Sequence, residues 1–145
     1  MEQREIKFRG YSVDDSEWIY GDLLTYRVFP VIFDKNKEQH EVDARSVGQY
    51  TGLKDKNGTE IYEGDVVKMH QFLFDGTEVE REHIGTVSFN NETACFEYTK
   101  IKGGFYEKYT GYDEGEGNSP ICLFFGLHEE SFEIIGNIYE HPSFN

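Results

Sequence analysis

The first part of the chain alternates apolar with polar residues in short runs that turns interrupt. Residues 6–11 alternate apolar with basic or small side chains, which predicts a strand with one buried face. Polar residues 12–17 predict a turn, and the aromatic run at 18–20 predicts a second strand that ends at Gly21. This pattern is typical of strands and not of helices.

Two further runs predict the next strands. Residues 26–33 predict a third strand, and Pro30 favours an edge position for it because proline cannot donate to a ladder. Residues 34–37 predict a turn toward a run at 38–42. Residues 43–49 predict one short helical turn.

The middle of the chain carries a strong turn signal at residues 54–58, where Asn57 and Gly58 tolerate the positive φ that such loops require. Asp75 and Gly76 predict a two-residue hairpin. Further strands are predicted at residues 61–62, 66–69, 86–89 and 93–98, with a turn at 90–91. The run at 132–139 is apolar on both faces, which predicts a strand in the centre of a sheet.

Together these elements predict a mostly β protein with little helix. We expect an N-terminal β subdomain over residues 1–53 and a second β subdomain over 54–145. Residues 100–120 are rich in Gly, Tyr and Glu without periodicity, which predicts a long loop. A small SH3-like barrel is one closure that leaves no open edge, although the periodicity does not select it over other small β folds.

The composition fits a single soluble domain or two small subdomains that share a core. A chain of 145 residues buries enough surface to fold without disulfides or metal. Cys95 and Cys122 stand alone in apolar surroundings, so we expect buried thiols, no disulfide framework and no structural zinc. The sequence shows neither a signal peptide nor an apolar run of membrane-spanning length, which predicts a cytoplasmic protein that binds no membrane.

Charge narrows the range of partners. The chain has 14 Lys and Arg against 28 Asp and Glu, a net charge of −14. Such a surface repels phosphate backbones, so direct nucleic-acid binding is disfavoured. The acids can instead attract a basic partner, or mimic nucleic acid and block a protein that binds DNA or RNA. The acids that could form such a mimic are Glu78, Glu80, Glu82, Asp113, Glu114 and Glu116.

Three segments together resemble the YopX-like family of phage and prophage proteins. They are residues 4–9 (REIKFR), 48–67 (GQYTGLKDKNGTEIYEGDVV) and 133–140 (EIIGNIYE). The resemblance implies an N-terminal portion used in self-association, a C-terminal SH3-like portion and a bacterial host. It implies no activity, because the function of the family is unknown.

Eight residues are candidates for an interaction site: Arg4, Lys7, Arg9, Trp18, Tyr20, Tyr62, Glu63 and Asp65. The basic three can form a small anion patch, but solvent-facing charges on a strand are the ordinary interpretation. Trp18 and Tyr20 suit either a core or a subunit contact. Glu63 and Asp65 can pair for acid–base or metal chemistry, although a turn with Asp65 as its hydrogen-bond acceptor is the simpler explanation.

The chain shows no motif for catalysis, a cofactor or a metal. Its five histidines never follow the zinc-protease spacing, and no Ser lies in a nucleophile elbow. We therefore expect a non-enzymatic phage accessory protein that self-associates and binds a host or phage macromolecule. The nucleic-acid mimic is one alternative. A metal-dependent hydrolase built from dispersed His, Asp and Glu is the other.

Overall fold

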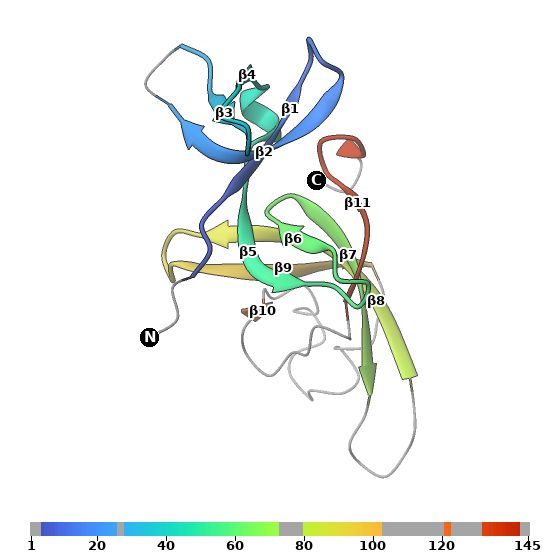
Figure 1. Cartoon of the computed structure of the whole chain (residues 1–145). Helices are drawn as coiled ribbons and strands as arrows, with labels where there is room; N and C mark the ends of the chain where they lie inside the picture. Colours follow the sequence, from blue (N-terminus) through green and yellow to red (C-terminus); the bar gives the residue numbers. More distant parts are fainter. Residues whose placement is uncertain (1–3, 26–27, 73–79, 103–120, 123–131, 143–145) are drawn as a thin grey trace. The chain divides into compact units, whose positions relative to one another are not determined.

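The computed structural model describes residues 4–25, 28–72, 80–102, 121–122 and 132–142 (Figure 1). Strands dominate these ranges and pair antiparallel in two sheets. Their one helical element of any length is a 3₁₀ turn, η1 (Ala44–Ser46), where a short helical turn is predicted. The mostly β expectation is confirmed.

The chain divides into two compact units. The first contains residues 1–53 and 60–63, and the second contains residues 54–59 and 64–145. The first unit is discontinuous in sequence, because residues 60–63 belong to it and residues 54–59 belong to the second unit. In the described ranges, no helix has the length and apolar character needed to span a bilayer.

The first unit holds a sheet of six strands in the order β4-β3-β2-β1-β5-β6. Strands β1 and β2 form a hairpin in which Arg9 lies opposite Tyr20 and Gly10 lies opposite Ile19. The strand bounds are β1 (Phe8–Ser12), β2 (Glu17–Leu24), β3 (Val31–Phe33), β4 (Gln39–Glu41), β5 (Gly48–Lys54) and β6 (Glu60–Tyr62).

One face of this sheet carries an apolar core. Ile19, Ile32 and Val42 are buried together, with Phe8, Leu23 and Val47 packed against them. A side chain at Gly10 would place its Cβ 2.6 Å from Val42 Cγ2, so glycine is needed for this close packing. The face of β1 that carries Phe8 therefore packs in this core, as the alternation of residues 6–11 predicts, although Ile6 itself is 57% exposed.

Two expectations for this sheet are wrong. Strand β3 lies between β2 and β4, not at an edge, because Pro30 precedes the strand and leaves its ladder intact. Strand β2 continues past Gly21 to Leu24, because the chain stays extended there. A Cβ at Gly21 would overlap the carbonyl oxygen of Phe33 on the paired strand.

The second unit holds five strands in the order β10-β9-β8-β7-β11. Its core contains Val66, Val67, Met69, Val87, Phe96, Tyr98 and Phe132, all nearly inaccessible to solvent. Buried Tyr98 keeps its hydroxyl satisfied by donating to the carbonyl oxygen of Val67 at 3.2 Å. Cys95 is a free, half-buried thiol. The strand bounds are β7 (Asp65–Phe72), β8 (Glu80–Asn90), β9 (Cys95–Lys102), β10 (Ile121–Cys122) and β11 (Phe132–Asn137).

Strand β11 ends the strand order of this sheet, so the expectation of a central strand is wrong. Its outer edge is nevertheless covered by the turn at residues 54–59. Lys56 N donates to the carbonyl oxygen of Phe132 at 2.9 Å, and Ile134 N donates to Asp55 Oδ2 at 3.1 Å. These bonds satisfy backbone groups of β11 that an open edge would leave unpaired, while Ile135 on the strand stays 43% exposed.

The described strands of this unit form an open order and not a closed barrel. The hairpin turn predicted at Asp75 and Gly76 lies outside the described residues, although β7 and β8 do pair antiparallel on either side of it. Most of the loop predicted over 100–120 also lies outside them, since β9 runs to Lys102.

Candidate functional site

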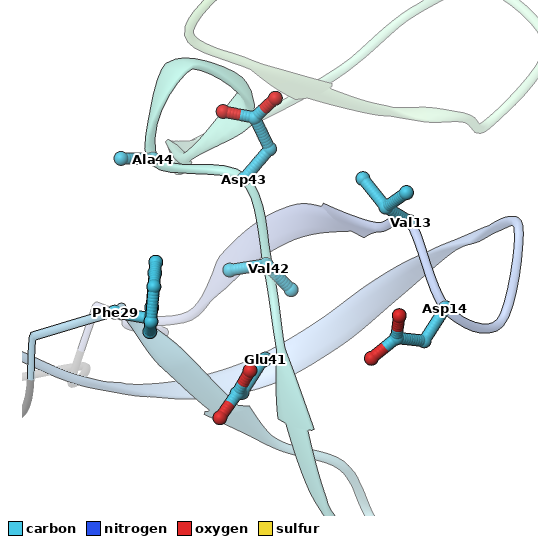
Figure 2. A pocket seen from close by; sticks show the side chains of 7 residues that line it. All are labelled: Val13, Asp14, Phe29, Glu41, Val42, Asp43 and Ala44. Atoms are coloured by element: carbon cyan, nitrogen blue, oxygen red, sulfur yellow. The ribbon is translucent and has the colours of Figure 1, made fainter.

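A pocket of about 350 Å³ opens on the first unit (Figure 2). Val13 and Phe29 lie on either side of the chain segment that carries Val42, with carboxylates near both ends of that segment. The volume is at the small end of the roughly 300–1,000 Å³ found for ligand pockets, which suits one or two side chains of a partner. The lining residues are Val13, Asp14, Phe29, Glu41, Val42, Asp43 and Ala44.

Local hydrogen bonds fix the segments that form the pocket. Val42 N donates to the carbonyl oxygen of Pro30 at 3.1 Å, and Asp43 N donates to that of Tyr11 at 2.9 Å. Asp43 then caps η1 by accepting from Arg45 N at 3.0 Å. These bonds tie the floor of the pocket to neighbouring segments of the first unit.

The pocket combines exposed apolar side chains with an acidic rim. Val13 is 64% exposed and Phe29 is 60% exposed, and Val28 beside it is 93% exposed. Asp14, Glu41 and Asp43 supply three carboxylates, of which Asp43 forms an ion pair of 2.9 Å with exposed Arg45. Single exposed apolar residues are common, but here two of them, Val13 and Phe29, line one hollow together.

Next to the pocket, the side chain of His40 joins two turns. Its Nδ1 lies 3.0 Å from Asp15 Oδ2, and its Nε2 lies 2.9 Å from Asp34 Oδ2. The hydrogen bond with Asp15, followed by that with Asp34, raises the pKa of His40. The bonds with His40 in turn lower the pKa of Asp15 and the pKa of Asp34. The arrangement stabilises a protonated imidazole between two carboxylates.

The same cluster is where the described residues could hold a metal ion. Ligand atoms of Asp34, Glu38 and His40 lie within 4.8 Å of one another. A metal needs His40 deprotonated, whereas its two carboxylate partners favour the protonated form. Asp34 Oδ1 already accepts the backbone amides of Asn36 and Glu38, at 2.8 and 3.0 Å. The geometry is that of a doubly bridged ion pair.

Five of the eight residues proposed from the sequence lie together on the other face of the first sheet. They form, with Tyr50, an aromatic–cation layer. The Arg9 guanidinium carbon lies 4.8 Å from the centre of the Trp18 ring and 5.1 Å from that of Tyr62. The rings of Tyr20 and Tyr62 are 5.5 Å apart. The layer comprises Lys7, Arg9, Trp18, Tyr20, Tyr50 and Tyr62.

Arg9 is 7% exposed, so the expectation of a solvent-facing charge is wrong for this residue. Its Nη2 donates to the carbonyl oxygen of Glu63 at 3.3 Å. Gly48 permits this approach, because a Cβ there would lie 2.5 Å from the same carbonyl oxygen. Burial between two rings replaces water around the guanidinium with cation–π contacts. Arg9 is therefore a packing residue of the layer.

The remaining proposed residues are not brought together. Arg4 is exposed near the beginning of the described chain. Glu63 and Asp65 do not form a pair of exposed carboxylates. Glu63 Oε1 accepts the backbone amide of Gln49 at 2.9 Å, and Asp65 is buried at the start of β7 in the second unit.

The acids proposed for a nucleic-acid mimic fall largely outside the described residues. This holds for Glu78, Asp113, Glu114 and Glu116. Glu80 and Glu82 lie in β8, where both are on alternate positions of one strand. The mimic therefore stays a prediction.

The sequence patterns predicted neither the pocket nor the His40 bridge. Their residues come from the β1–β2 turn, the segment before β3, the turn between β3 and β4, and strand β4 with the residues after it. No local spacing connects these segments. Exposed apolar residues at Val13 and Val28–Phe29, each beside an acid or a turn, were the available signal, but isolated exposed apolar residues are common.

Comparison with known proteins gives a family and a distant structural match. Among curated proteins the comparison finds no match. The crystal structure of protein EF1440 from Enterococcus faecalis matches with a TM-score of 0.48 and 18% identity over 97% of each chain. The family model for YopX protein matches residues 7–144. Since that match spans nearly the whole chain, the protein belongs to the YopX family.

Proposed function

We propose that this protein is a non-enzymatic phage or prophage accessory protein that binds a host or phage macromolecule in the bacterial cytoplasm. The pocket of the first unit is its contact surface. The observation that carries the proposal is the group of exposed apolar residues, Val13, Val28 and Phe29, beside a preformed hollow. Burying such residues against a partner is favourable by about 25 cal/mol per Å² of apolar surface.

Site-specific photo-crosslinking in bacteria that carry the phage tests this contact. A photoreactive residue at position 29 is compared with one at position 135, an exposed apolar position of the second unit. We expect a discrete adduct with one protein from position 29 only, and binding of that purified protein that Phe29→Ser weakens. Equal adduct patterns from both positions would contradict the assignment of the pocket.

We also propose that the chain self-associates through the aromatic–cation layer, and that the second unit completes an SH3-like barrel. Tyr20 is 47% exposed although its ring packs on Tyr62, and partly exposed Tyr and Trp are enriched in interfaces. Native mass spectrometry should find an oligomer in the wild type and a monomer in Tyr20→Ser. A monomeric wild type refutes self-association.

A further inference from the structure

The pocket suggests the chemistry of its occupant. We infer that it receives a basic, apolar-anchored peptide segment of the partner, in which Lys or Arg flanks one or two large apolar side chains. This inference rests on the proposed contact function of the pocket and goes further by naming the partner chemistry. It commits to a protein segment and not to a second copy of this chain.

The apolar floor of the pocket suits an apolar side chain of the partner. Val13 and Phe29 face the hollow with most of their surface exposed, and Val42 at its floor belongs to the buried core. An apolar side chain entering the pocket would cover these residues and rest against a fixed core residue. The small volume limits the anchor to one or two side chains.

The negative charges around the pocket complement a basic segment. Three carboxylates line the hollow, and Arg45 offsets one of them through its ion pair with Asp43. Within the part of the first unit that the structure describes, Asp14 and Glu41 form no salt bridge. They therefore give the apolar centre a negative rim, which attracts Lys or Arg beside the anchor. A second copy of a chain with a net charge of −14 meets repulsion at this rim. The rim therefore favours a basic segment over self-association at this surface.

Peptide binding to the purified full chain tests the inference. The probe is a fluorescein-labelled peptide of alternating lysine and leucine, and its matched control replaces lysine with glutamate. We expect fluorescence anisotropy to show binding of the lysine peptide only. Asp14→Asn and Glu41→Gln should each weaken it by about threefold and together by about tenfold. Phe29→Ser should weaken it by a similar factor.

Variants of two exposed acids outside the pocket are the controls, because they distinguish recognition at the pocket from attraction to the total negative charge of the chain. Asp22→Asn and Glu92→Gln change the same residue types at exposed positions, and they should leave the affinity for the lysine peptide within about twofold of the wild type.

Equal losses of affinity in the pocket variants and the control variants overturn the inference, as does equal binding of the glutamate peptide. An oligomer that Phe29→Ser dissociates would assign the pocket to a second copy and also overturn it. If position 29 crosslinks a partner while the lysine peptide fails, the contact function stands and only the occupant is wrong.

Discussion

His40 links two turns of the first unit through a side chain that titrates near neutral pH. Both ring nitrogens face carboxylates, one from the β1–β2 turn and one from the turn before β4. Ser12 Oγ donates to Asp15 Oδ2 at 3.2 Å and helps to hold it. An imidazole in this position ties together two segments that also carry residues of the pocket, Asp14 and Glu41.

The stability of the first unit should therefore depend on the protonation of His40. Because the folded-state pKa of His40 is raised, its contribution is fully present below the unfolded pKa and is lost as pH rises through the folded pKa. The lowered pKa values of Asp15 and Asp34 act at the acid end, where their contribution is lost as pH falls through the folded values. The urea concentration at the midpoint of unfolding should therefore fall as the pH rises above about 6.5, the ordinary pKa of histidine.

His40→Gln should flatten that fall in the urea midpoint, because glutamine does not titrate. His141→Gln is the control, since His141 is an exposed histidine of the other unit. It should retain the pH dependence of the wild type. The same pH dependence in His40→Gln as in the wild type would show that the bridge does not contribute to stability.

At the scale of elements, one turn explains how β11 is held. Asp55 is 5% exposed, and its Oδ1 accepts the amides of Asn57 and Thr59, both at 2.9 Å. Its Oδ2 accepts Ile134 N on β11 at 3.1 Å. Gly58, with a φ of +81°, completes the turn. One carboxylate thus orders the turn and attaches it to the strand.

Asp55→Ala should destabilise the second unit by about 2–4 kcal/mol, because three amides lose a charged acceptor. Asp55→Asn should destabilise the unit less. The oxygen of asparagine can still accept from the amides of the turn, and only its amide group, which faces the Ile134 N–H donor, loses a hydrogen bond. Chemical denaturation gives both free energies of unfolding. Glu92→Ala, at an exposed turn position, should change the free energy of unfolding by less than about 0.5 kcal/mol. A neutral Asp55→Ala would contradict the proposed role.

Sequence patterns predicted the elements that depend on local chemistry. Alternation located β1 and the face on which Phe8 packs in the apolar core, and the Asn57–Gly58 signal located the turn before β6. Strand positions within a sheet were predicted badly, because they depend on pairing between distant segments. The edge position given to β3 and the central position given to β11 failed for this reason.

For the candidate site too, residues on one strand could be predicted from the sequence, whereas contacts between distant segments could not. The sequence named Arg9 and Tyr20 as candidates because their strands alternate clearly, but it placed Arg9 in an anion patch and did not predict that the two lie in one layer. Tyr62 joins them from a distant strand, β6. The pocket was missed because its walls come from separate turns, and folding alone makes Phe29 and Glu41 neighbours. Burial of Arg9 was also unpredictable, since it needs rings from two other strands.

At the scale of the whole molecule, repulsion among acids should outweigh the exposed ion pairs. The chain has 14 more acidic than basic residues. Described pairs such as Lys56–Glu133, at 3.2 Å, are partly exposed, so solvent screening leaves them little net contribution to stability. Excess charge of one sign destabilises a compact state through self-repulsion. Salt screens both effects, so the larger one decides the sign of the response.

Thermal unfolding should therefore shift to higher temperature as NaCl rises from about 10 mM to about 150 mM, where the Debye length shrinks to about 8 Å. A gain of about 1 kcal/mol corresponds to roughly 2–4 °C for larger domains and more for small ones. Glu92→Lys removes negative charge at an exposed position, so it should raise Tm in low salt and reduce the increment that salt adds. A Tm that falls with salt would mean that local ion pairs, such as the bridge at His40, dominate the electrostatics of folding. In that case the acid surface would be neutralised within the chain, and the attraction of a basic segment to the pocket rim would lose its physical basis.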